Sequence, residues 1–395
     1  MKRLPGSAGA WASSVREAVL KSSMALNIKI RAVESRANLK RFIEYPFERY
    51  REDAHWVPPL LLAERQKFNP KKNPFYEHAR IELFLAERDG ELVGRVAAID
   101  DDNHNRTHND NLVFFGFFEA NDQAAAEALL SRVENWGRRL GRNTVRGPAN
   151  PSMNDGAGFQ INAFNTDPYV MMPYNPPEYP RYVESAGYQK VKDLYAWHFE
   201  RDQEMGEKIE RLAKRVRARY NPVTRPVDMK RFDEELALVK KLYNEAWEEN
   251  WGFVRYTEAE FDHLATELKH IVDPELVRFV ELEGQVAGIG VCIPDVNQVL
   301  KRMRGRLMPF GIFAFLRRKK IIDQLRLAIL GLRPEHRNKG LETVLVDELY
   351  GPAIAKGYQR CECSWVLEDN RAMNRALKAS GAKLYKTYRI YQKEL

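Results

Sequence analysis

Cysteine is scarce in this chain of 395 residues, and no apolar run approaches the ~20 residues needed to span a membrane. The three cysteines, Cys292, Cys361 and Cys363, form neither an even disulfide set nor a zinc-binding spacing, which fits a reducing compartment. The phosphate-binding motif GxxxxGK[ST] is also absent, so the P-loop nucleotide-binding class is excluded. No metal site is predicted.

The chain has a globular composition and a positive net charge. Apolar residues make up 44%, and 395 residues exceed what one hydrophobic core usually supports, so we predict two domains. A net charge of +8 suits phosphates, nucleic acid or anionic lipid without choosing among them. Residues 1–27 are basic and rich in Ala and Ser, and we expect them to be a disordered extension. The alternative is that the start is assigned too early and that Met24 is the true first residue.

The two halves of the chain repeat one another. Residues 84–103 and 279–297 each contain a strand, a turn at an acidic residue plus glycine, and a second strand, which is the pattern of a hairpin. Both halves also close with a helix that stops at a glycine before a final strand. Three pairs of glycines are each 194 positions apart: Gly90 and Gly284, Gly94 and Gly288, and Gly187 and Gly381.

We therefore predict two copies of one α/β unit, covering residues 28–201 and 222–395, with the boundary in the charged stretch between them. Each unit reads as a strand, a helical region, the hairpin, a strand–helix–strand crossover, and a closing helix and strand. Antiparallel strands that give way to a crossover imply a mixed, α+β-like sheet. The Asp- and His-rich run 100–110 is expected to be a polar hairpin loop.

A cationic turn separates the predicted strand 325–332 from the predicted helix 341–357. It carries Arg337, Lys339 and Gly340 directly before the helix begins. A helix N-terminus presents unpaired N–H groups and the positive end of the helix dipole, so it attracts anions, and glycine lets a ligand approach the backbone. The turn therefore fits a bound phosphate; a basic surface turn is the alternative.

This order of elements resembles the GNAT superfamily of acyl-CoA N-acyltransferases, as two GNAT-like units in tandem over nearly the whole chain. The turn is similar to the (Q/R)xxGx(G/A) motif of that family, with Arg337, Gly340 and Glu342 in the specified places. The resemblance implies an acetyl-CoA or longer acyl-CoA donor, a pyrophosphate held by backbone amides, and a pantetheine arm aligned by strand 327–330. The cofactor-binding residues implied in this way are Leu330, Leu332, Arg337, Asn338, Lys339, Gly340, Leu341 and Asn370.

Two residues depart from the family pattern. Glu342 stands where the family prefers Gly or Ala, although a glutamate in the first turn of a helix can point away from the ligand. Leu377 occupies the place of the usual tyrosine acid, so that role is not transferred. A phenol from Tyr385, Tyr388 or Tyr391 could replace it, with aromatic packing as the alternative.

Candidate bases lie at the end of the strand 360–368. Transfer to an amine requires removal of the amine's proton, and a carboxylate, acting directly or through water, is the usual base. Strand alternation predicts Cys361 and Cys363 on one face and Glu362 on the other. Glu368 and Asp369 at the strand end could instead cap a helix or face solvent. The candidates are Glu362, Glu368 and Asp369.

Two regions are expected to line the acceptor pocket. The stretch 243–257 concentrates aromatic residues around a glycine, at a place that flanks the acceptor side in GNAT folds. The N-terminal unit lacks the cationic turn, so it is expected to help build the cleft through its long insert 147–180 instead of binding coenzyme A. The residues predicted to contact the acceptor are Asn250, Trp251, Phe253, Asn154, Tyr174 and Asn175.

The segment 299–330 alternates Arg and Lys with Leu, Met, Phe and Ile, which suits contact with an anionic membrane surface; a buried insert with a solvated basic rim is the alternative. Together with MMPYNPP, NWGF and GRLMPFG, it is similar to the GNAT-type bacterial ceramide synthases, which acylate sphingoid bases. This resemblance implies a lipid or small-molecule amine acceptor, and a cytoplasmic protein at the inner membrane face.

Two other functions stay open. Fem-like aminoacyl transferases also pair two GNAT-like units, but they use aminoacyl-tRNA as donor. A non-catalytic, membrane-associated protein on a GNAT scaffold would account for Glu342 and for the missing tyrosine. Direct nucleic-acid binding is not expected, because the basic residues are scattered and no RNA-stacking motif is present.

Overall fold

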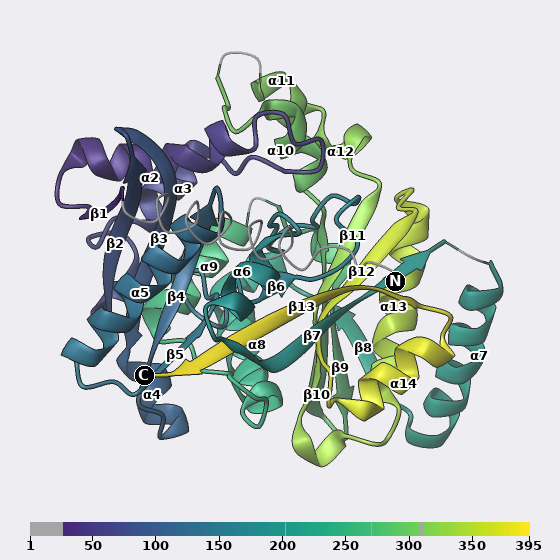
Figure 1. Ribbon diagram of the computed structural model, residues 1–395. Helices are drawn as coiled ribbons and strands as arrows, with labels where there is room; N and C mark the ends of the chain where they lie inside the picture. The colour runs from purple at the N-terminus through teal and green to yellow at the C-terminus, as the bar shows by residue number, and fades with distance from the viewer. Residues whose placement is uncertain (1–26, 202, 270, 309–310) are drawn as a thin grey trace, which may run out of the picture.

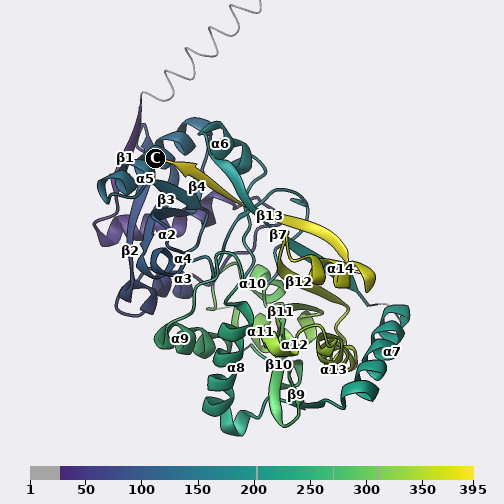
Figure 2. The same cartoon turned by 90° about the horizontal axis from the view of Figure 1, so that it is seen from below.

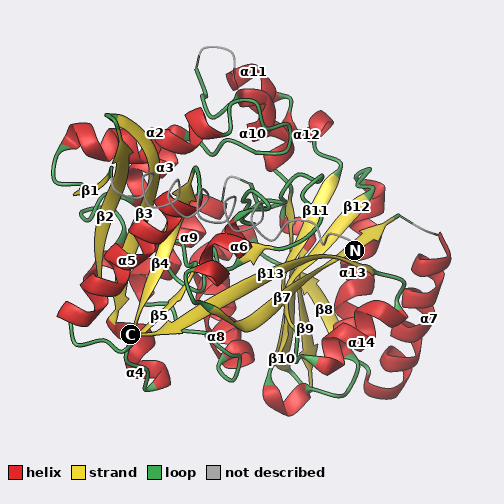
Figure 3. Ribbon diagram, viewed as in Figure 1, coloured by secondary structure: helices red, strands yellow, loops and turns green. Residues whose placement is uncertain are grey.

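The computed structural model describes residues 27–201, 203–269, 271–308 and 311–395, so the predicted N-terminal extension lies outside the described residues except for its last position. Within them, a single 13-stranded sheet runs through both halves of the chain, with helices on both of its faces (Figure 1, Figure 3). The architecture is the mixed α/β fold of two tandem GNAT-like units that the sequence predicts.

The N-terminal half begins with an edge strand, two helices and a long hairpin, followed by the strand–helix–strand crossover and the closing helix and strand. Its elements are β1 (Ile28–Ala32), α2 (Arg36–Arg49), α3 (Leu61–Lys67), the 3-10 helix η1 (Pro74–Glu77), β2 (Ala79–Arg88), β3 (Glu91–Asp101), α4 (Asp102–His108), β4 (Leu112–Ala120), α5 (Gln123–Arg139), β5 (Thr144–Gly147), β6 (Phe159–Gln160), α6 (Tyr179–Ser185) and β7 (Gln189–Glu200).

The C-terminal half repeats this order after a connecting helix. Its elements are α7 (Gln203–Tyr220), β8 (Val223–Pro226), η2 (Met229–Arg231), α8 (Phe232–Trp247), α9 (Glu258–Leu268), η3 (Pro274–Leu276), β9 (Val277–Leu282), β10 (Gln285–Pro294), α10 (Asn297–Met303), α11 (Gly311–Leu316), α12 (Arg318–Ile321), β11 (Gln324–Leu332), η4 (Pro334–His336), α13 (Leu341–Ala355), β12 (Arg360–Leu367), α14 (Arg371–Ala379) and β13 (Lys383–Glu394).

The two predicted hairpins have matching turns. Asp89–Gly90 joins β2 to β3, Glu283–Gly284 joins β9 to β10, and all four residues have positive φ, as a type I′ turn requires. Gly94 and Gly288 match as well, since a Cβ at either position would lie 2.6 Å from a carbonyl oxygen of the neighbouring strand. The sequence repeat is therefore a repeat of backbone geometry.

The final strands of the two halves exchange places in the sheet. The strand order is β1-β2-β3-β4-β5-β13-β7-β12-β11-β10-β9-β8, so β13 completes the N-terminal half and β7 pairs with β12 of the C-terminal half. Figure 1 shows β13, in yellow, beside β7. Among the described strands, β4–β5 and β11–β12 pair in parallel and the others antiparallel, which confirms the predicted mixed sheet.

Each half of the sheet has a helix layer on both faces. In the N-terminal half, α5 packs on one face through Leu129 and Leu130, and α2 on the other through Phe42 and Ile43. In the C-terminal half, α13 and α8 take the same two places. Figure 2 shows α8 and α9 on one side of the C-terminal strands, and α13 and α7 on the other.

The Asp- and His-rich run at 100–110 is not the loop that the sequence predicts. Asp102–His108 form the helix α4, because the carboxylate of Asp101 accepts hydrogen bonds from the amides of Asn103 and His104 and so caps the first turn. The polar residues that indicated a loop instead form a short helix, which the Asp101 side chain caps.

The basic segment between β10 and β11 is also helical. Its three short helices, α10, α11 and α12, lie together at the top of Figure 1. Among the described residues, we find no helix with both the length and the apolar character needed to cross a membrane.

Candidate functional site

The central strands of the C-terminal half part from one another, and the candidate residues gather at the opening. The parallel ladder between β11 and β12 ends at the pair Leu327–Cys363, whereas β11 runs on to Leu332 and β12 to Leu367. Residues of these strands alternate between two cavities, one on each face of the sheet. As predicted, Cys361 and Cys363 line the cavity on one face, and Glu362 bonds to Ser364 on the other.

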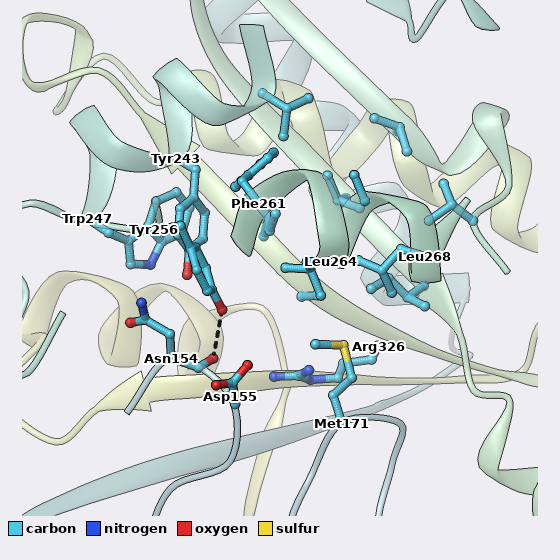
Figure 4. A pocket seen from close by; sticks show the side chains of 18 of the residues that line it. Asn154, Asp155, Met171, Tyr243, Trp247, Tyr256, Phe261, Leu264, Leu268 and Arg326 are labelled. Carbon is cyan, nitrogen blue, oxygen red and sulfur yellow. Dashed lines mark hydrogen bonds between the residues drawn. The ribbon is translucent and has the colours of Figure 1, made fainter. Parts of the chain in front are cut away.

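The first cavity has a volume of about 280 Å³ and lies between the sheet and the helices α8 and α9 (Figure 4). Its wall is largely apolar, and on one side of it Asn154, Asp155 and Arg326 lie near one another. A wall of this kind suits an amphipathic ligand. The labelled aromatic and aliphatic side chains that project into it are Tyr243, Trp247, Tyr256, Phe261, Leu264 and Leu268.

Four of the six predicted acceptor residues line this cavity. Asn154 comes from the insert of the N-terminal half, whereas Asn250, Trp251 and Phe253 follow α8. The Asn154 amide donates to the carbonyl of Val254 at 2.6 Å, which fixes the two segments together. The hydroxyl of Tyr256 donates to the Asn154 carbonyl at 3.4 Å, the dashed line in Figure 4.

The remaining two predicted acceptor residues hold the insert in place away from the cavity. Tyr174 donates its hydroxyl proton to Asp53 at 2.7 Å. The buried amide of Asn175 accepts from the Gln160 amide at 2.7 Å and donates to the Gln160 carbonyl at 3.1 Å. The structure therefore gives both residues a part in folding the insert.

Arg326 is a buried cation on the polar side of the first cavity. It is 6% exposed, and its Nε and Nη2 donate to the hydroxyl and the carbonyl of Ser364, each at 3.0 Å. Burial lowers the pKa of its guanidinium, and the charge of Glu362 opposes that shift. A guanidinium has five N–H groups, so donors remain for an oxygen of a bound ligand.

Glu362 is the centre of a buried polar cluster. One of its oxygens accepts from the Ser364 hydroxyl at 2.6 Å, and the other accepts from the hydroxyl of Tyr385. Burial raises the pKa of Tyr385, and Glu362 raises it further, so the phenol stays protonated and donates. Because Ser364 lines the first cavity, its hydroxyl lies between that cavity and Glu362.

Two further ionisable groups lie in the buried region around this cluster. Burial lowers the pKa of Lys386 to about 8, against the opposing charge of Glu362, and its Nζ donates to the Asp167 carbonyl at 2.8 Å. Burial also raises the pKa of Asp295 to about 7. Asp295 accepts from the Val170 amide at 2.8 Å, so both groups hold the loop 166–170 near the cluster.

The other two predicted bases are engaged in surface ion pairs. Glu368 pairs with Lys190 at 2.6 Å and accepts from the amide of Asp193. Asp369 pairs with Lys192 at 2.7 Å, and that hydrogen bond is the main reason why its pKa is lowered. The structure thus brings Glu362 to the strand opening and the other two candidates to the surface, and the base role of all three stays a prediction.

The second cavity lies on the opposite face of the sheet, between β11, α13, α14 and α7, and has a volume of about 270 Å³. The predicted cofactor residue Leu330 lines it, and so does Leu377, which stands in the place of the family's tyrosine. Glu342 lines this cavity as well, from the first turn of α13. Leu332 packs into the core beside α13, and the Asn370 side chain caps α14 by accepting from the Met373 amide at 3.1 Å.

The cationic turn approaches the second cavity at the start of α13. Gly340 is the N-cap with φ of 78°, and no side chain caps the helix. Arg337 faces α8, where its guanidinium donates to the Ala246 carbonyl at 3.0 Å and to Glu249 at 3.1 Å. The Lys339 ammonium lies 3.3 Å from His336 Nδ1. Arg337 therefore anchors the turn, while Asn338, Lys339, Gly340 and Leu341 lead into the uncapped end of α13.

Arg326, Ser364 and Lys386 are absent from the residues that the sequence predicts for the site. They come from three different strands, β11, β12 and β13, so no single stretch of the sequence groups them. A cation in a strand that is otherwise apolar, as in QLRLAILGL, was the one signal available for Arg326.

Comparison with models of known protein families finds no match. Two curated relatives do match over most of the chain. The chain is 36% identical over 377 residues to the bacterial ceramide synthase of Caulobacter vibrioides (strain NA1000 / CB15N), with 93% of this chain and 98% of that protein covered. It is 31% identical over 374 residues to Protein YghO of Escherichia coli (strain K12), with 93% and 95% covered.

Solved structures resemble this fold at low sequence identity. A tandem GNAT protein from the clavulanic acid biosynthesis pathway superposes with a TM-score of 0.55 at 12% identity, over 93% of this chain and 98% of that one. The GCN5-related glucosamine N-acetyltransferase region of a fungal β-N-acetylglucosaminidase gives a TM-score of 0.53 at 12% identity, over 93% of this chain and 38% of that one. From the long sequence match and the shared architecture, we conclude that the chain belongs to the family of the bacterial ceramide synthase and has the tandem GNAT fold.

Proposed function

We propose that this protein is an N-acyltransferase that moves an acyl group from acyl-CoA to the primary amine of a long-chain, sphingoid-type lipid. The observation that carries the proposal is the pair of cavities on opposite faces of the sheet, placed back to back where β11 and β12 part. Two substrates can approach that opening from opposite sides, with the Glu362–Ser364 pair beside it.

The residues at the second cavity fit the acyl-CoA donor. The end of α13 has no side-chain cap, and Gly340 leaves room for a phosphate at the backbone. Asn338 to Leu341 would hold the pyrophosphate, and Leu330 would lie along the pantetheine arm. When bound, the coenzyme supplies an acyl thioester, whose carbonyl carbon an amine can attack.

The first cavity fits the hydrocarbon chain of the acceptor. The Caulobacter relative is named a ceramide synthase, and a ceramide is the amide of a fatty acid with a long-chain amine. Each methylene buried against the apolar wall contributes about 0.8 kcal/mol. On the polar side of this cavity, the free N–H groups of Arg326 can hold an oxygen near the amine.

The reaction requires one proton to leave the amine. The amine nitrogen attacks the thioester carbonyl carbon, the new C–N bond forms and the C–S bond breaks. Over the whole reaction, the proton that the amine gives up is balanced by the proton that the departing sulfur takes up, so coenzyme A leaves as the thiol. The Ser364 hydroxyl donates to Glu362 and accepts from Arg326, so it can pass the amine's proton to Glu362. Glu362 is thus the terminal base of a short relay.

Native mass spectrometry with acetyl-CoA and palmitoyl-CoA, followed by an assay with a sphingoid base, tests the proposal. We expect one acyl-CoA bound per chain, release of free thiol, and an N-acylated product. Aminoacyl-tRNA is the comparison donor, since the Fem-like alternative stays an untested prediction. Transfer from the tRNA and none from either acyl-CoA would overturn the proposal in favour of that alternative.

A further inference from the structure

The helical insert between β10 and β11 carries concentrated positive charge. Its residues 299–322 include eight Lys or Arg and no Asp or Glu. Lys301 pairs with Asp167, and Arg318 lies over the ring of Phe315. Six others are exposed, and none of the six forms an ion pair with a residue that the structure describes: Arg302, Arg304, Arg306, Arg317, Lys319 and Lys320.

Large apolar side chains stand exposed among these cations. Met308 and Leu316 are each 67% exposed and Phe313 is 60% exposed. Leu62 of α3 is 68% exposed and belongs to the same region, because the neighbouring Leu61 amide donates to the Gly305 carbonyl at 3.2 Å. Four of the five most exposed large hydrophobic side chains among the described residues therefore lie here. Clustering of this kind marks an interaction surface.

We propose that this surface, formed by α10–α12 and Leu62, docks the protein on an anionic lipid bilayer. Cations attract the negative headgroups, and Met308, Phe313 and Leu316 can enter the layer below them. An acidic protein or an RNA would satisfy the cations, but neither requires exposed methionine and leucine at the same place. The proposal rests on charge and exposure, so it stands even if the proposed acyl transfer fails.

The docking surface is tied directly to the candidate site. The Asp167 carboxylate pairs with Lys301 of α10 at 2.5 Å, and its carbonyl accepts from Lys386 at 2.8 Å. Asn297, also on α10, donates to the Pro168 carbonyl at 2.8 Å. The loop that lies near the Glu362 cluster thus also carries the docking helices, so a docked bilayer would lie next to the site.

Flotation of the full chain with lipid vesicles tests the proposal. The probes are vesicles of phosphatidylcholine alone and of phosphatidylcholine mixed with phosphatidylglycerol. We expect the protein to float with the anionic vesicles and to stay behind with the neutral ones. The reversal Arg304→Glu, Arg306→Glu, Lys319→Glu and Lys320→Glu should weaken binding by roughly 100-fold or more, since each cation near the surface contributes about fivefold.

A matched variant with the same change in net charge is the control. Arg36→Glu, Arg80→Glu, Arg139→Glu and Lys230→Glu reverse four exposed cations on other elements, and flotation should stay within about twofold of the unchanged protein. Equal loss in both variants would overturn the docking surface, because it would show a response to net charge alone.

A second variant separates lipid from other polyanions. Met308→Ser, Phe313→Ser and Leu316→Ser keep every cation, so retention on a heparin column should not change, while flotation should fall at least about tenfold. Unchanged flotation of this variant would contradict insertion into the bilayer. Flotation that nuclease treatment of the protein abolishes would assign the surface to nucleic acid and would overturn the proposal.

Discussion

The two helices that follow the crossover strands, α5 and α13, begin in opposite ways. At α5 the Asp122 carboxylate accepts from the Ala125 amide at 3.0 Å and pairs with Arg88 at 2.6 Å, and that pairing lowers the pKa of Asp122. At α13 the N-cap is Gly340 and no side chain caps the helix. The N-terminal half therefore supplies its own anion at the helix start, whereas the C-terminal half supplies none at the place where we propose that the phosphates of acyl-CoA bind.

The strand openings differ in the same way. The two halves can be aligned residue by residue, because Gly94 pairs with Ala120 in one half and Gly288 pairs with Leu332 in the other. In this alignment, the strand pair Phe114–Arg146 of the N-terminal half matches the pair Arg326–Glu362 of the C-terminal half. A Cβ on Gly116 would lie 1.7 Å from the Ala149 carbonyl oxygen. The backbone of β4 and the segment that follows β5 are therefore still in contact beyond the pair Phe114–Arg146. The opening is closed on the N-terminal side.

Under the proposed function, the duplicated backbone carries the chemistry in one copy and a structural role in the other. The N-terminal half keeps the hairpin, the crossover and both helix layers, but its helix end is neutralised. Its insert instead lines the first cavity of the other half through Met153, Asn154, Asp155 and Met171. Four experiments can break or sharpen this division of labour.

The largest effect is expected at Glu362, which has no counterpart at the matching position of the N-terminal half. Glu362→Gln keeps the shape of the side chain and an acceptor for one of the two hydroxyls of Ser364 and Tyr385, but it removes the base, and a positioned base typically contributes about 10²- to 10⁴-fold. We expect kcat for thiol release from acyl-CoA to fall by roughly that factor, with the melting temperature little changed.

Glu368→Gln is the matched control for that experiment, because it makes the same chemical change just beyond the end of the same strand, in a carboxylate held by a surface ion pair. We expect kcat within about twofold of the unchanged protein. A full loss in this variant, with Glu362→Gln active, would move the base to the strand end.

The second experiment closes the first cavity, as the opening of the N-terminal half is closed. Leu264→Trp adds bulk to a wall residue of the cavity and should raise KM for a long-chain amine roughly tenfold or more, while affinity for acyl-CoA is unchanged. The measurement is KM across a series of amine chain lengths. Leu384→Trp, at an exposed position of β13, is the control. An equal effect on short and long amines would contradict the chain-binding role.

The third experiment gives α13 the carboxylate cap that α5 has. Gly340→Asp places a negative charge at the proposed phosphate site and should weaken acyl-CoA binding about five- to thirtyfold by isothermal titration. Gly357→Asp is the control, since Gly357 follows the same helix at its other end, with φ of 88°. If both variants bind acyl-CoA equally well, the uncapped end of α13 does not hold the phosphates.

The smallest effect concerns the contact between the halves. His78 lies 3.1 Å from Asp101 and 3.0 Å from Glu260 of α9, and these hydrogen bonds raise its pKa from 6.5 to about 9, although burial opposes the shift. The folded protein holds the His78 proton more tightly than the unfolded chain does. Protonated His78 therefore stabilises the fold fully below pH 6.5, and this stabilisation is lost as pH rises toward about 9. The free energy of unfolding should therefore fall by about 1–3 kcal/mol across that window.

Chemical denaturation at several pH values measures this slope, and His78→Gln should flatten it. An unchanged slope in His78→Gln would assign the pH dependence to other groups. Asp295 and Asp155, whose pKa values burial raises to about 7 and about 6, act in the same sense at lower pH. The folded protein holds their protons more tightly as well, so the free energy of unfolding also falls as pH rises toward those values.

Local pattern was enough to predict much of the fold. The type I′ turns follow from an acidic residue before Gly90 and Gly284, and the helix boundaries from glycines and from apolar periodicity. The exception, α4, shows the limit of composition, because its capping by Asp101 is a matter of geometry. The stretch 243–257 was singled out for the same local reason, as aromatic residues concentrated around Gly252, and the structure places it on the wall of the first cavity.

Long-range placement decided the rest. Glu362 was one of three candidates in the sequence. In the structure it is buried and bonded to Ser364, whereas the other two pair with Lys190 and Lys192 at the surface. Tyr174 and Asn154 share one insert, yet one folds it and the other lines the cavity. The partners of these side chains lie on distant parts of the chain, so no local pattern records where each side chain is placed.

The sequence by itself determined that this protein repeats one α/β unit and that one copy carries a glycine-bearing cationic turn before a helix, since turns and caps depend on neighbours along the chain. Only the tertiary structure decided that the final strands change places and that Arg326, Ser364, Glu362, Lys386 and Tyr385 gather at one opening. The reason is that burial and ladder register are set by strands far apart in sequence, whose meeting no single segment specifies.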